Sequence, residues 1–248
     1  MSARGFLGAG DVYMNPIVDG VPQGWVGPYE ATKFEIKPNV ELREQISKGK
    51  NTYGQVIESV ALQQPADLTV DFAEVNKETM RTALLGTAKT ASQAAGNVSN
   101  EALTAKLGVW VPTSKFAISN VVVTNAAGTT TYVEGEDYIV NEDLGWVKAL
   151  EGGDITADQP LQVDFSYAAK TADDIEGATQ ADVRVKFKFD GKNQVDGLPV
   201  QVDVYEAVIA ADSAFDFLAD EFNTVSLPGR MKTPTGFTHP FKVRQLRA

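Results

Sequence analysis

The stretch DVRVKFKFD, residues 182–190, has the clearest secondary-structure pattern in this chain of 248 residues. Its apolar and charged side chains alternate strictly, as in a strand that buries one face and exposes the other. The alternating apolar residues are Val183, Val185, Phe187 and Phe189. Turn-forming residues fill positions 191–197, and valines alternate again over 200–204. The pattern predicts an antiparallel hairpin with one wet face.

A second hairpin is predicted nearer the N-terminus. Apolar and charged residues alternate over 34–43, turn-prone residues occupy 48–51, and a further run covers 53–62. Residues 68–72 predict another strand with one wet face. Residues 2–27 contain many glycines and no sustained period, so we expect an arm or long loop there.

One helix is predicted over residues 77–85. Asn76 suits its N-cap and Gly86 its C-terminal end. Its apolar stripe is expected to cover one sheet and consists of Val75, Met80, Ala83 and Leu84. Residues 87–106 are rich in small polar residues and are expected to form a linker or exposed loop. A further short helix is expected over 214–222.

Residues 107–169 are predicted to form a small Ig-like β insertion. Short strand patterns separated by turn residues lie at 117–124, 129–133, 138–141, 146–149 and 161–167. The larger domain would then consist of residues 1–106 and 170–248, closed by strands at 224–231 and 240–246. The expected fold is mainly β, a sandwich or barrel with one flanking helix.

Charge is distributed unevenly along the chain, whose net charge is −11. The insertion is strongly acidic, which favours its projection from the main body because like charges repel. No acidic residue follows Glu221, so the C-terminal tail is basic. The overall acidity argues against a protein that grips nucleic-acid phosphates. An acidic body with a basic tail suits head-to-tail self-association, and a merely solvated tail explains it equally well.

Composition excludes several other classes. The chain has no cysteine, so it has no disulfide, thiolate metal site or cysteine nucleophile. No run approaches the ~18 apolar residues of a membrane span. No signal peptide is visible, and we expect synthesis in the cytosol.

The sequence predicts no catalytic site. His239 is the only histidine, and no GxSxG nucleophile motif accompanies it. A role at a strand edge or an interface is therefore favoured over catalysis. The glycines at 5, 8 and 10 do not match the GxGxxG spacing of a dinucleotide site, and they suit close backbone approach better.

No cofactor or metal site is predicted either. Asp190, Asn193 and Asp196 suit hairpin turns better than a calcium loop, because the EF-hand spacing is absent. The acidic clusters of the insertion are interpreted as a solvated face, with a weak cation site as the alternative. The three tryptophans lie in different segments, and packing explains them better than a sugar-stacking platform.

Four segments resemble the tail tube (major tail) proteins of long-tailed bacteriophages of the siphophage type. They are GAGDVY at 8–13, ATKFEIK at 31–37, KGKNTYGQVIESVALQQPADLTVDF at 48–72 and DFLADEF at 216–222. The likeness rests on the order of these segments. It implies a β-sandwich with a flanking helix, in which hairpin strands from six copies close one large barrel around a channel.

The resemblance also implies a function. Such a protein polymerises as stacked hexameric rings and forms the conduit for DNA ejection in the virion tail, after assembly in the host cytoplasm. Its implied partners are further copies of itself and the tape measure, tail terminator and distal tail proteins. DNA would pass through the lumen without tight binding, and no membrane is involved.

Two sets of residues are expected to serve this function. Contacts between subunits are assigned to the arm, the hairpin tip and the basic tail: Phe6, Leu7, Tyr13, Trp25, Lys48, Lys50, Tyr53, Arg230, Lys232 and Arg244. The lumen is assigned to polar hairpin positions: Glu41, Arg43, Gln45, Gln55, Glu58, Asp67, Thr69 and Asp71. An acidic lining would repel DNA phosphates, although the face that turns inward stays open, because a one-residue shift exchanges the two faces.

Two alternative functions remain. The first is an extracellular-type β-sandwich adhesin or a virion decoration protein, in which the acidic insertion binds a sugar or a cation. The second is a hydrolase on a β scaffold, which would need a pocket that gathers His239 or two carboxylates. The first alternative predicts a monomer with ligand affinity, and the second predicts that substitution of His239 abolishes activity.

Overall fold

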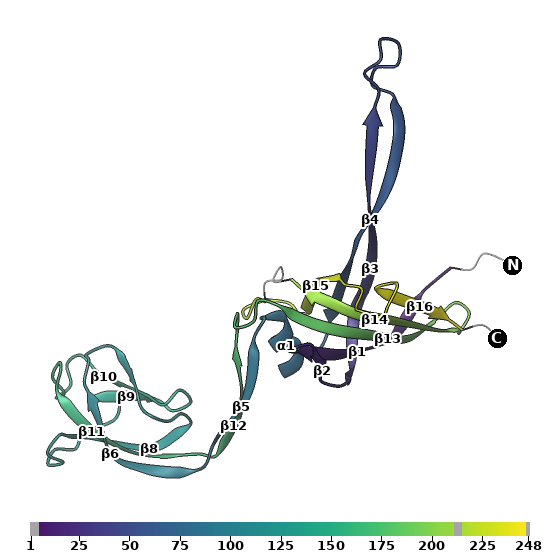
Figure 1. Ribbon diagram of the computed structural model, residues 1–248. Helices are drawn as coiled ribbons and strands as arrows, with labels where there is room; N and C mark the ends of the chain where they lie inside the picture. Colours follow the sequence, from purple (N-terminus) through teal and green to yellow (C-terminus); the bar gives the residue numbers. More distant parts are fainter. Residues whose placement is uncertain (1–4, 211–214, 247–248) are drawn as a thin grey trace. The chain divides into compact units, whose positions relative to one another are not determined.

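The computed structural model describes residues 5–210 and 215–246 (Figure 1). The chain divides into two compact units, with unit 1 formed by Met1–Ala88 and Ile175–Ala248 and unit 2 formed by Lys89–Asp174. Strands dominate both units, and one α-helix flanks unit 1, which confirms the predicted mainly β, sandwich-type fold. No helix in these described ranges is long and apolar enough to span a membrane.

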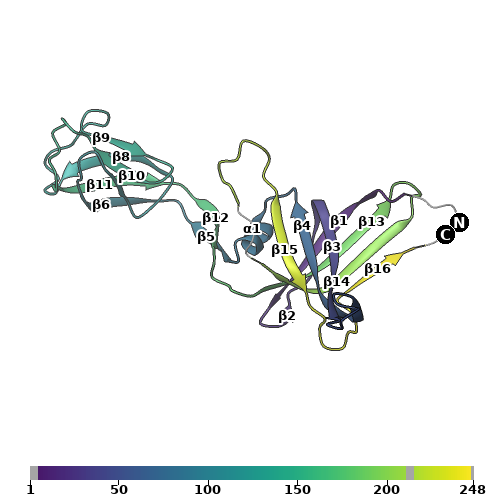
Figure 2. The same ribbon diagram turned by 90° about the horizontal axis from the view of Figure 1, so that it is seen from above.

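Unit 1 is built around an antiparallel barrel (Figures 1 and 2). Its strands are β1 (Gly8–Val18), β2 (Val21–Pro22), β3 (Val26–Ile46), β4 (Val56–Phe72), β13 (Val183–Asn193), β14 (Pro199–Ile209), β15 (Val225–Met231) and β16 (Phe241–Gln245). The order is β13-β1-β3-β4-β15-β14-β16, and β13 also pairs with β14. This last pairing closes six strands around one apolar core.

The hairpin of β13 and β14 supplies much of that core. Val185 and Phe187 on β13 and Val204 on β14 have almost no exposed surface, and the alternate side chains on both strands are charged or polar. Full burial of such a side chain contributes about 1.5–3 kcal/mol. The alternation at residues 182–190 therefore reflects a strand with its apolar face in the barrel, as predicted.

Strand β1 corrects the prediction of an arm over residues 2–27. It pairs with β13 from Gly8, opposite Asn193, to Ile17, and its Val12 and Met14 are completely buried. Gly10 explains the error, because a Cβ at this position would lie 2.4 Å from the carbonyl oxygen of Asp190. This glycine permits close packing of two strands, which the sequence alone could not distinguish from a loop glycine. Residues 2–4 of the predicted arm lie outside the described residues.

The predicted helix is present as α1 (Lys77–Ala83), with Asn76 as its N-cap. The Asn76 side chain accepts hydrogen bonds from the backbone N–H groups of Glu78 and Thr79, and Thr79 Oγ1 accepts one from the Asn76 N–H. The predicted apolar stripe is correct only in part: Ala83 packs against the barrel core, but Val75 is exposed, and the fully buried helical side chains are Thr79 and Thr82. These threonines are buried because their hydroxyls bond to the backbone, at Asn76 and Glu78.

The end of α1 also differs from the prediction. Leu85, at φ +47°, occupies the left-handed position that the sequence suggested for glycine. The N–H of Gly86 donates to the carbonyl of Arg81 and the N–H of Leu85 to that of Thr82, which is the Schellman pattern. Gly86 is needed instead for close packing, since a Cβ there would lie 2.5 Å from the carbonyl oxygen of Glu176.

The core of unit 2 is formed by two three-stranded sheets, β7-β10-β9 and β6-β11-β8. Their strands are β6 (Gly96–Thr104), β7 (Trp110–Pro112), β8 (Ile118–Asn125), β9 (Tyr138–Asn141), β10 (Trp146–Ala149) and β11 (Pro160–Tyr167). One cluster of buried side chains, including Val123, Val147 and Val163, draws on both sheets. The arrangement is a small sandwich with its own core.

Three local predictions are corrected. Residues 87–106 are not a linker, because they contain β5 (Thr87–Gln93) and β6, and β5 pairs with β12 (Lys170–Glu176). Residues 129–133 form only an isolated bridge at Thr131. Residues 215–222 contain turns and no helix, and position 214 lies outside the described residues. In the first case, backbone pairing forms strands from small polar residues that carry no apolar period.

Candidate assembly surface

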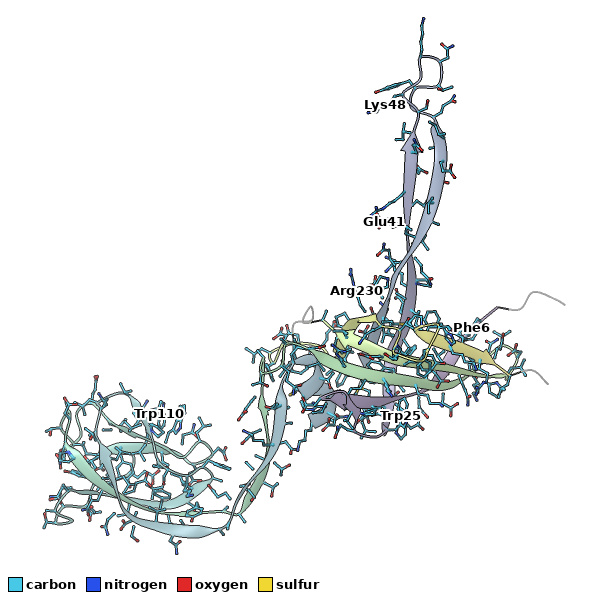
Figure 3. All side chains as sticks on the ribbon, viewed as in Figure 1. Phe6, Trp25, Glu41, Lys48, Trp110 and Arg230 are labelled. Carbon is cyan, nitrogen blue, oxygen red and sulfur yellow. The ribbon has the colours of Figure 1, made fainter. Side chains whose placement is uncertain are left out.

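Unit 1 carries a hairpin that extends beyond its barrel (Figures 1 and 3). We call residues 38–65, the outer part of β3 and β4, the distal hairpin. β4 (Val56–Phe72) is one long strand that joins the run predicted at 68–72 to the run predicted at 53–62, whose first three residues belong to the tip. Within the described residues, β3 pairs only with β4 beyond Glu30, and β4 pairs only with β3 before Asp67. The distal hairpin therefore has two strand edges without a partner.

The tip of the distal hairpin is a defined turn. Ser47 N–H donates to the carbonyl of Gln55 at 2.8 Å, and the N–H of Gly54 donates to the carbonyl of Ser47 at 2.9 Å. The hydroxyls of Ser47 and Thr52 are 2.6 Å apart, and Ser47 is buried although its neighbours are exposed. These contacts hold Lys48, Lys50 and Tyr53 at the outer end of the hairpin, where Lys48 is labelled in Figure 3.

One face of the distal hairpin carries a row of exposed aliphatic side chains, interrupted by Glu44 and flanked in part by polar β4 residues. Even-numbered β3 residues share one side, and at Phe34 and Ile36 that side packs against the barrel core. Beyond the barrel the same side carries Val40, Leu42 and Ile46, which expose 61%, 64% and 55% of their surface. We call these three residues the aliphatic stripe. The side of β3 that faces the barrel core thus continues along the distal hairpin, where nothing in the described chain covers it.

The opposite side is polar along β3, but its β4 positions include the exposed Val60 and Leu62, which pair with Arg43 and Glu41. Odd-numbered β3 residues from Lys33 to Gln45 share this side, and the β4 residues paired with them include Glu58, Asp67, Thr69 and Asp71. The structure therefore places seven of the eight predicted lumen residues on one side of the ribbon. The eighth, Gln55, lies in the tip.

This polar side is less acidic than predicted. Lys33 and Lys37 face Asp71 and Asp67 across the β3–β4 pairing, and Lys33 forms an ion pair with Glu35 at 2.8 Å. Hydrogen bonding and charge attraction from Lys33 lower the pKa of the Glu35 carboxyl. Neither lysine was among the predicted lumen residues, although their alternation with Phe34 and Ile36 could have assigned them to this side.

The predicted contact residues lie in several separate places. Phe6, Leu7 and Trp25 are exposed, as are the tip residues, whereas Tyr13 is half-buried within β1. The chain before β1 is tied to β13 by Asn193, whose Oδ1 accepts from the N–H of Leu7 at 2.9 Å and whose Nδ2 donates to the carbonyl of Gly5 at 3.2 Å. Asn193 was interpreted only as a turn residue, and its anchoring role required the fold.

Two of the predicted basic contacts already have acidic partners within the chain. Arg230 lies 3.5 Å from Asp67, and Lys232 lies 3.3 Å from the buried carboxylate of Glu206. Glu206 also accepts from Arg184 at 2.9 Å, and Arg184 in turn binds Asp182. Hydrogen bonds to Asp182 and then Glu206 raise the pKa of the Arg184 guanidinium, and the bond from Arg184 lowers the pKa of Asp182. By contrast, Arg244 forms no ion pair within the described chain and donates only to Gln201, at 3.3 Å.

His239 lies at a groove of about 930 Å³ between the base of the distal hairpin and the chain from β15 to β16. Its Nε2 is 3.5 Å from Tyr205 Oη and its Nδ1 is 3.0 Å from Thr238 Oγ1. Across the described ranges, no carboxylate contacts this imidazole and no group of three potential metal ligands occurs. The groove offers an exposed histidine between two hydroxyl groups.

The fold and surface together define a mainly β protein whose barrel carries a projecting, partly apolar hairpin. A family model described as "Protein of unknown function UCP028589" matches residues 5–233, and the chain belongs to this family. No curated protein matches the chain.

Proposed function

We propose that the protein is a structural subunit that polymerises with copies of itself as stacked rings and forms the tail tube of a bacteriophage. The observation that supports this most directly is the distal hairpin. An isolated two-stranded hairpin is marginally stable in water and gains stability from further strands or a covered apolar face. A neighbouring copy would supply both.

The energetics favour such a partner. Each residue of the aliphatic stripe exposes more than half of its surface, so covering it would contribute about 1–2 kcal/mol per side chain. The unpaired edges of β3 and β4 would gain hydrogen-bonded neighbours at the same time. A ring closes these edges within its own plane, and heterologous stacking of rings then extends the polymer.

The polar side of the same ribbon is proposed to line the lumen. It carries acidic, basic and neutral polar side chains, with the apolar Val60 and Leu62 among them. A lining of this kind presents no continuous basic track for DNA phosphates, so DNA would pass without tight binding. The resemblance to tail tube proteins adds the proposed number of six subunits, the location in the virion tail and the tape measure, tail terminator and distal tail proteins as partners.

The test is assembly of the purified protein, followed by negative-stain electron microscopy and light scattering over a concentration series. The wild type is expected to form rings or hollow tubes. Leu42→Asp places a charge on the aliphatic stripe and is expected to prevent assembly while circular dichroism stays unchanged. Gln45→Asp adds the same charge to the opposite side of the same strand and is expected to retain assembly.

Two outcomes would contradict the proposal. The first is a wild-type protein that stays monomeric at high concentration, even when preformed tail ends are supplied as initiators. The second is a Leu42→Asp variant that forms tubes as readily as the wild type.

A second candidate function is ligand binding by unit 2. Register places Lys148 opposite Trp110 and Trp146 opposite Pro112, so both tryptophans share one face of the β7-β10-β9 sheet. Such a face can stack on a sugar ring. However, Lys148 Nζ lies 4.9 Å from the Trp110 ring centroid, which leaves Trp146 as the freer platform. Glycan-array binding that Trp146→Ala abolishes, from a protein that does not polymerise, would favour this candidate.

A further inference from the structure

An exposed apolar and acidic segment leads into β15. It consists of residues 216–222, DFLADEF, which we call the acidic loop. Phe217 and Leu218 expose 70% and 90% of their surface, and Phe222 is fully exposed. Three carboxylates accompany these side chains, and no basic residue lies among them. Large apolar groups in water beside unpaired acids indicate a surface that a partner covers.

The acidic loop has a defined conformation. The N–H of Leu218 donates to Asp216 Oδ1 at 2.9 Å, and Asn223 Nδ2 donates to the carbonyl of Asp216. The ring of Phe217 packs edge-on against Phe215, whose centroid is 4.7 Å away and which itself packs against the barrel core. The backbone turn at Asp216–Leu218 is therefore anchored to the barrel, with its apolar side chains on the surface.

A pocket of matching chemistry lies elsewhere on unit 1. Its volume is about 490 Å³, within the range of about 300–1,000 Å³ typical of ligand clefts. Most of its lining is apolar and includes Phe6, Phe34, Phe189, Val202 and Val243. It lies beside β16 and the part of β3 beyond Glu30, and each of these has a strand edge without a partner in the described residues. We call it the β16 pocket.

The charges of the two surfaces are complementary. β16 contributes Val243 and Gln245 to the pocket and carries Lys242 and Arg244 at the alternate positions. Neither of these bases forms an ion pair within the described chain, nor do the carboxylates of the acidic loop. These two bases lie on the other face of β16, along the unpaired strand edge that borders the pocket. Opposite charges beside apolar anchors favour one orientation of docking.

The two surfaces lie at opposite ends of the barrel. The chain that leads into β15 is near the end that carries α1, whereas β16 and the labelled Phe6 are at the other end (Figures 1, 2 and 3). A single copy therefore cannot bring them together. Building on the proposed self-assembly, we propose that the acidic loop of one copy docks in the β16 pocket of a second copy, with Phe217 and Leu218 as the anchors.

Single-cysteine variants test this docking directly, because the natural chain has no cysteine. Leu218→Cys and Val243→Cys are purified separately, mixed and treated with a short bismaleimide. The mixture is expected to yield crosslinked dimers, and neither variant alone should yield them efficiently. Two controls pair Leu218→Cys with Ile57→Cys on the distal hairpin and with Thr238→Cys at the His239 groove. Crosslinking to either control as strong as to Val243→Cys would overturn the assignment.

Charge reversal gives an independent readout. Asp220→Lys with Glu221→Lys is expected to raise the concentration required for assembly about tenfold, the effect of losing about 1.4 kcal/mol at one contact. Adding Lys242→Glu and Arg244→Glu in the same chain should restore assembly. If the wild type and the charge-reversed loop variants assemble equally well, the proposed docking is wrong but the proposed self-assembly stands. A wild type that neither assembles nor crosslinks would overturn the proposed function as well.

Discussion

Replacing Phe187 by alanine should lower the stability of unit 1 and leave unit 2 unchanged. Phe187 has no exposed surface, and its strand β13 pairs with β1 on one side and β14 on the other. No neighbouring strand can move in to fill the space, so we expect the loss of about 3–5 kcal/mol that is typical of a buried phenylalanine. Unit 1 contains about 160 residues. For that size, each kcal/mol shifts the melting temperature by about 2–4 °C, which gives a shift of roughly 6–20 °C.

The tryptophans allow the two units to be followed separately. Trp25 belongs to unit 1, whereas Trp110 and Trp146 belong to unit 2. Trp25 is half-exposed, so Trp25→Phe should be tolerated, and tryptophan fluorescence then reports on unit 2 alone. Calorimetry in this background, at a concentration where light scattering shows a monomer, is expected to show the Phe187→Ala shift in the transition that fluorescence does not report.

Phe165→Ala is the matched control, because Phe165 is buried to a similar degree in the core of unit 2. It should lower the fluorescence-detected transition and leave the other in place. The reasoning fails if Phe187→Ala moves both transitions equally, since the two cores would then unfold as one cooperative unit.

Three further predictions concern single sites. Backbone hydrogen bonds from Val133 and Asp154 lower the pKa of the Asp137 carboxyl. The stability that these bonds confer is therefore present above the pKa of an unfolded aspartate, ~3.9. It is lost as the pH falls through that value and then through the lower pKa of the folded protein. Asp137→Asn should therefore flatten the acid dependence of unit 2 in urea titrations at pH 6 and pH 3. Gly145→Ala should destabilise unit 2 by more than about 1 kcal/mol, and by more than Gly152→Ala does. Both glycines have positive φ, but only at Gly145 would the new Cβ meet backbone, at Lys115. Equal melting temperatures of the two variants would contradict this. Asn76→Ala should cost unit 1 about 1 kcal/mol through loss of the N-cap, and Asn76→Asp should restore most of it.

Strict alternation allowed the sequence to predict the strands that bury one face. β13 satisfies that condition, because Val183, Val185 and Phe187 all point into the barrel. β1 does not, because Gly8 and Gly10 interrupt its pattern, and at Gly10 the backbones of β1 and β13 approach closely. β5 and β12 were missed for a different reason: they pair through their backbones, and their side chains carry no apolar period. Local pattern predicts burial, whereas pairing of this kind depends on the partner strand.

The candidate surface was predictable in part for the same reason. Alternation assigned Glu41, Arg43 and Gln45 to one side of β3, and the structure places seven of the eight predicted residues on that side. Glu58 shares this side with Asp67 only because the β3–β4 register shifts between them, which the sequence pattern does not show. Periodicity cannot show where a strand leaves its core, so Leu42 has the same sequence pattern as Phe34 although only Phe34 has a core to pack against. The acidic loop and the β16 pocket are distant in sequence, and their complementarity required the fold.

The features that unit 1 leaves unsatisfied differ in kind, and this bears on how copies would join. The distal hairpin offers strand edges and an aliphatic stripe, whose interactions are strong but have little selectivity, so alone they would favour disordered aggregation. The acidic loop and the β16 pocket combine apolar anchors with opposite charges, which fix orientation. Because these two surfaces are different and lie at opposite ends of the barrel, their contact is heterologous, and repetition of it gives a closed ring or a filament instead of a symmetric pair. On this account the loop and pocket set the geometry of the neighbouring copy, and the hairpin then adds most of the binding energy.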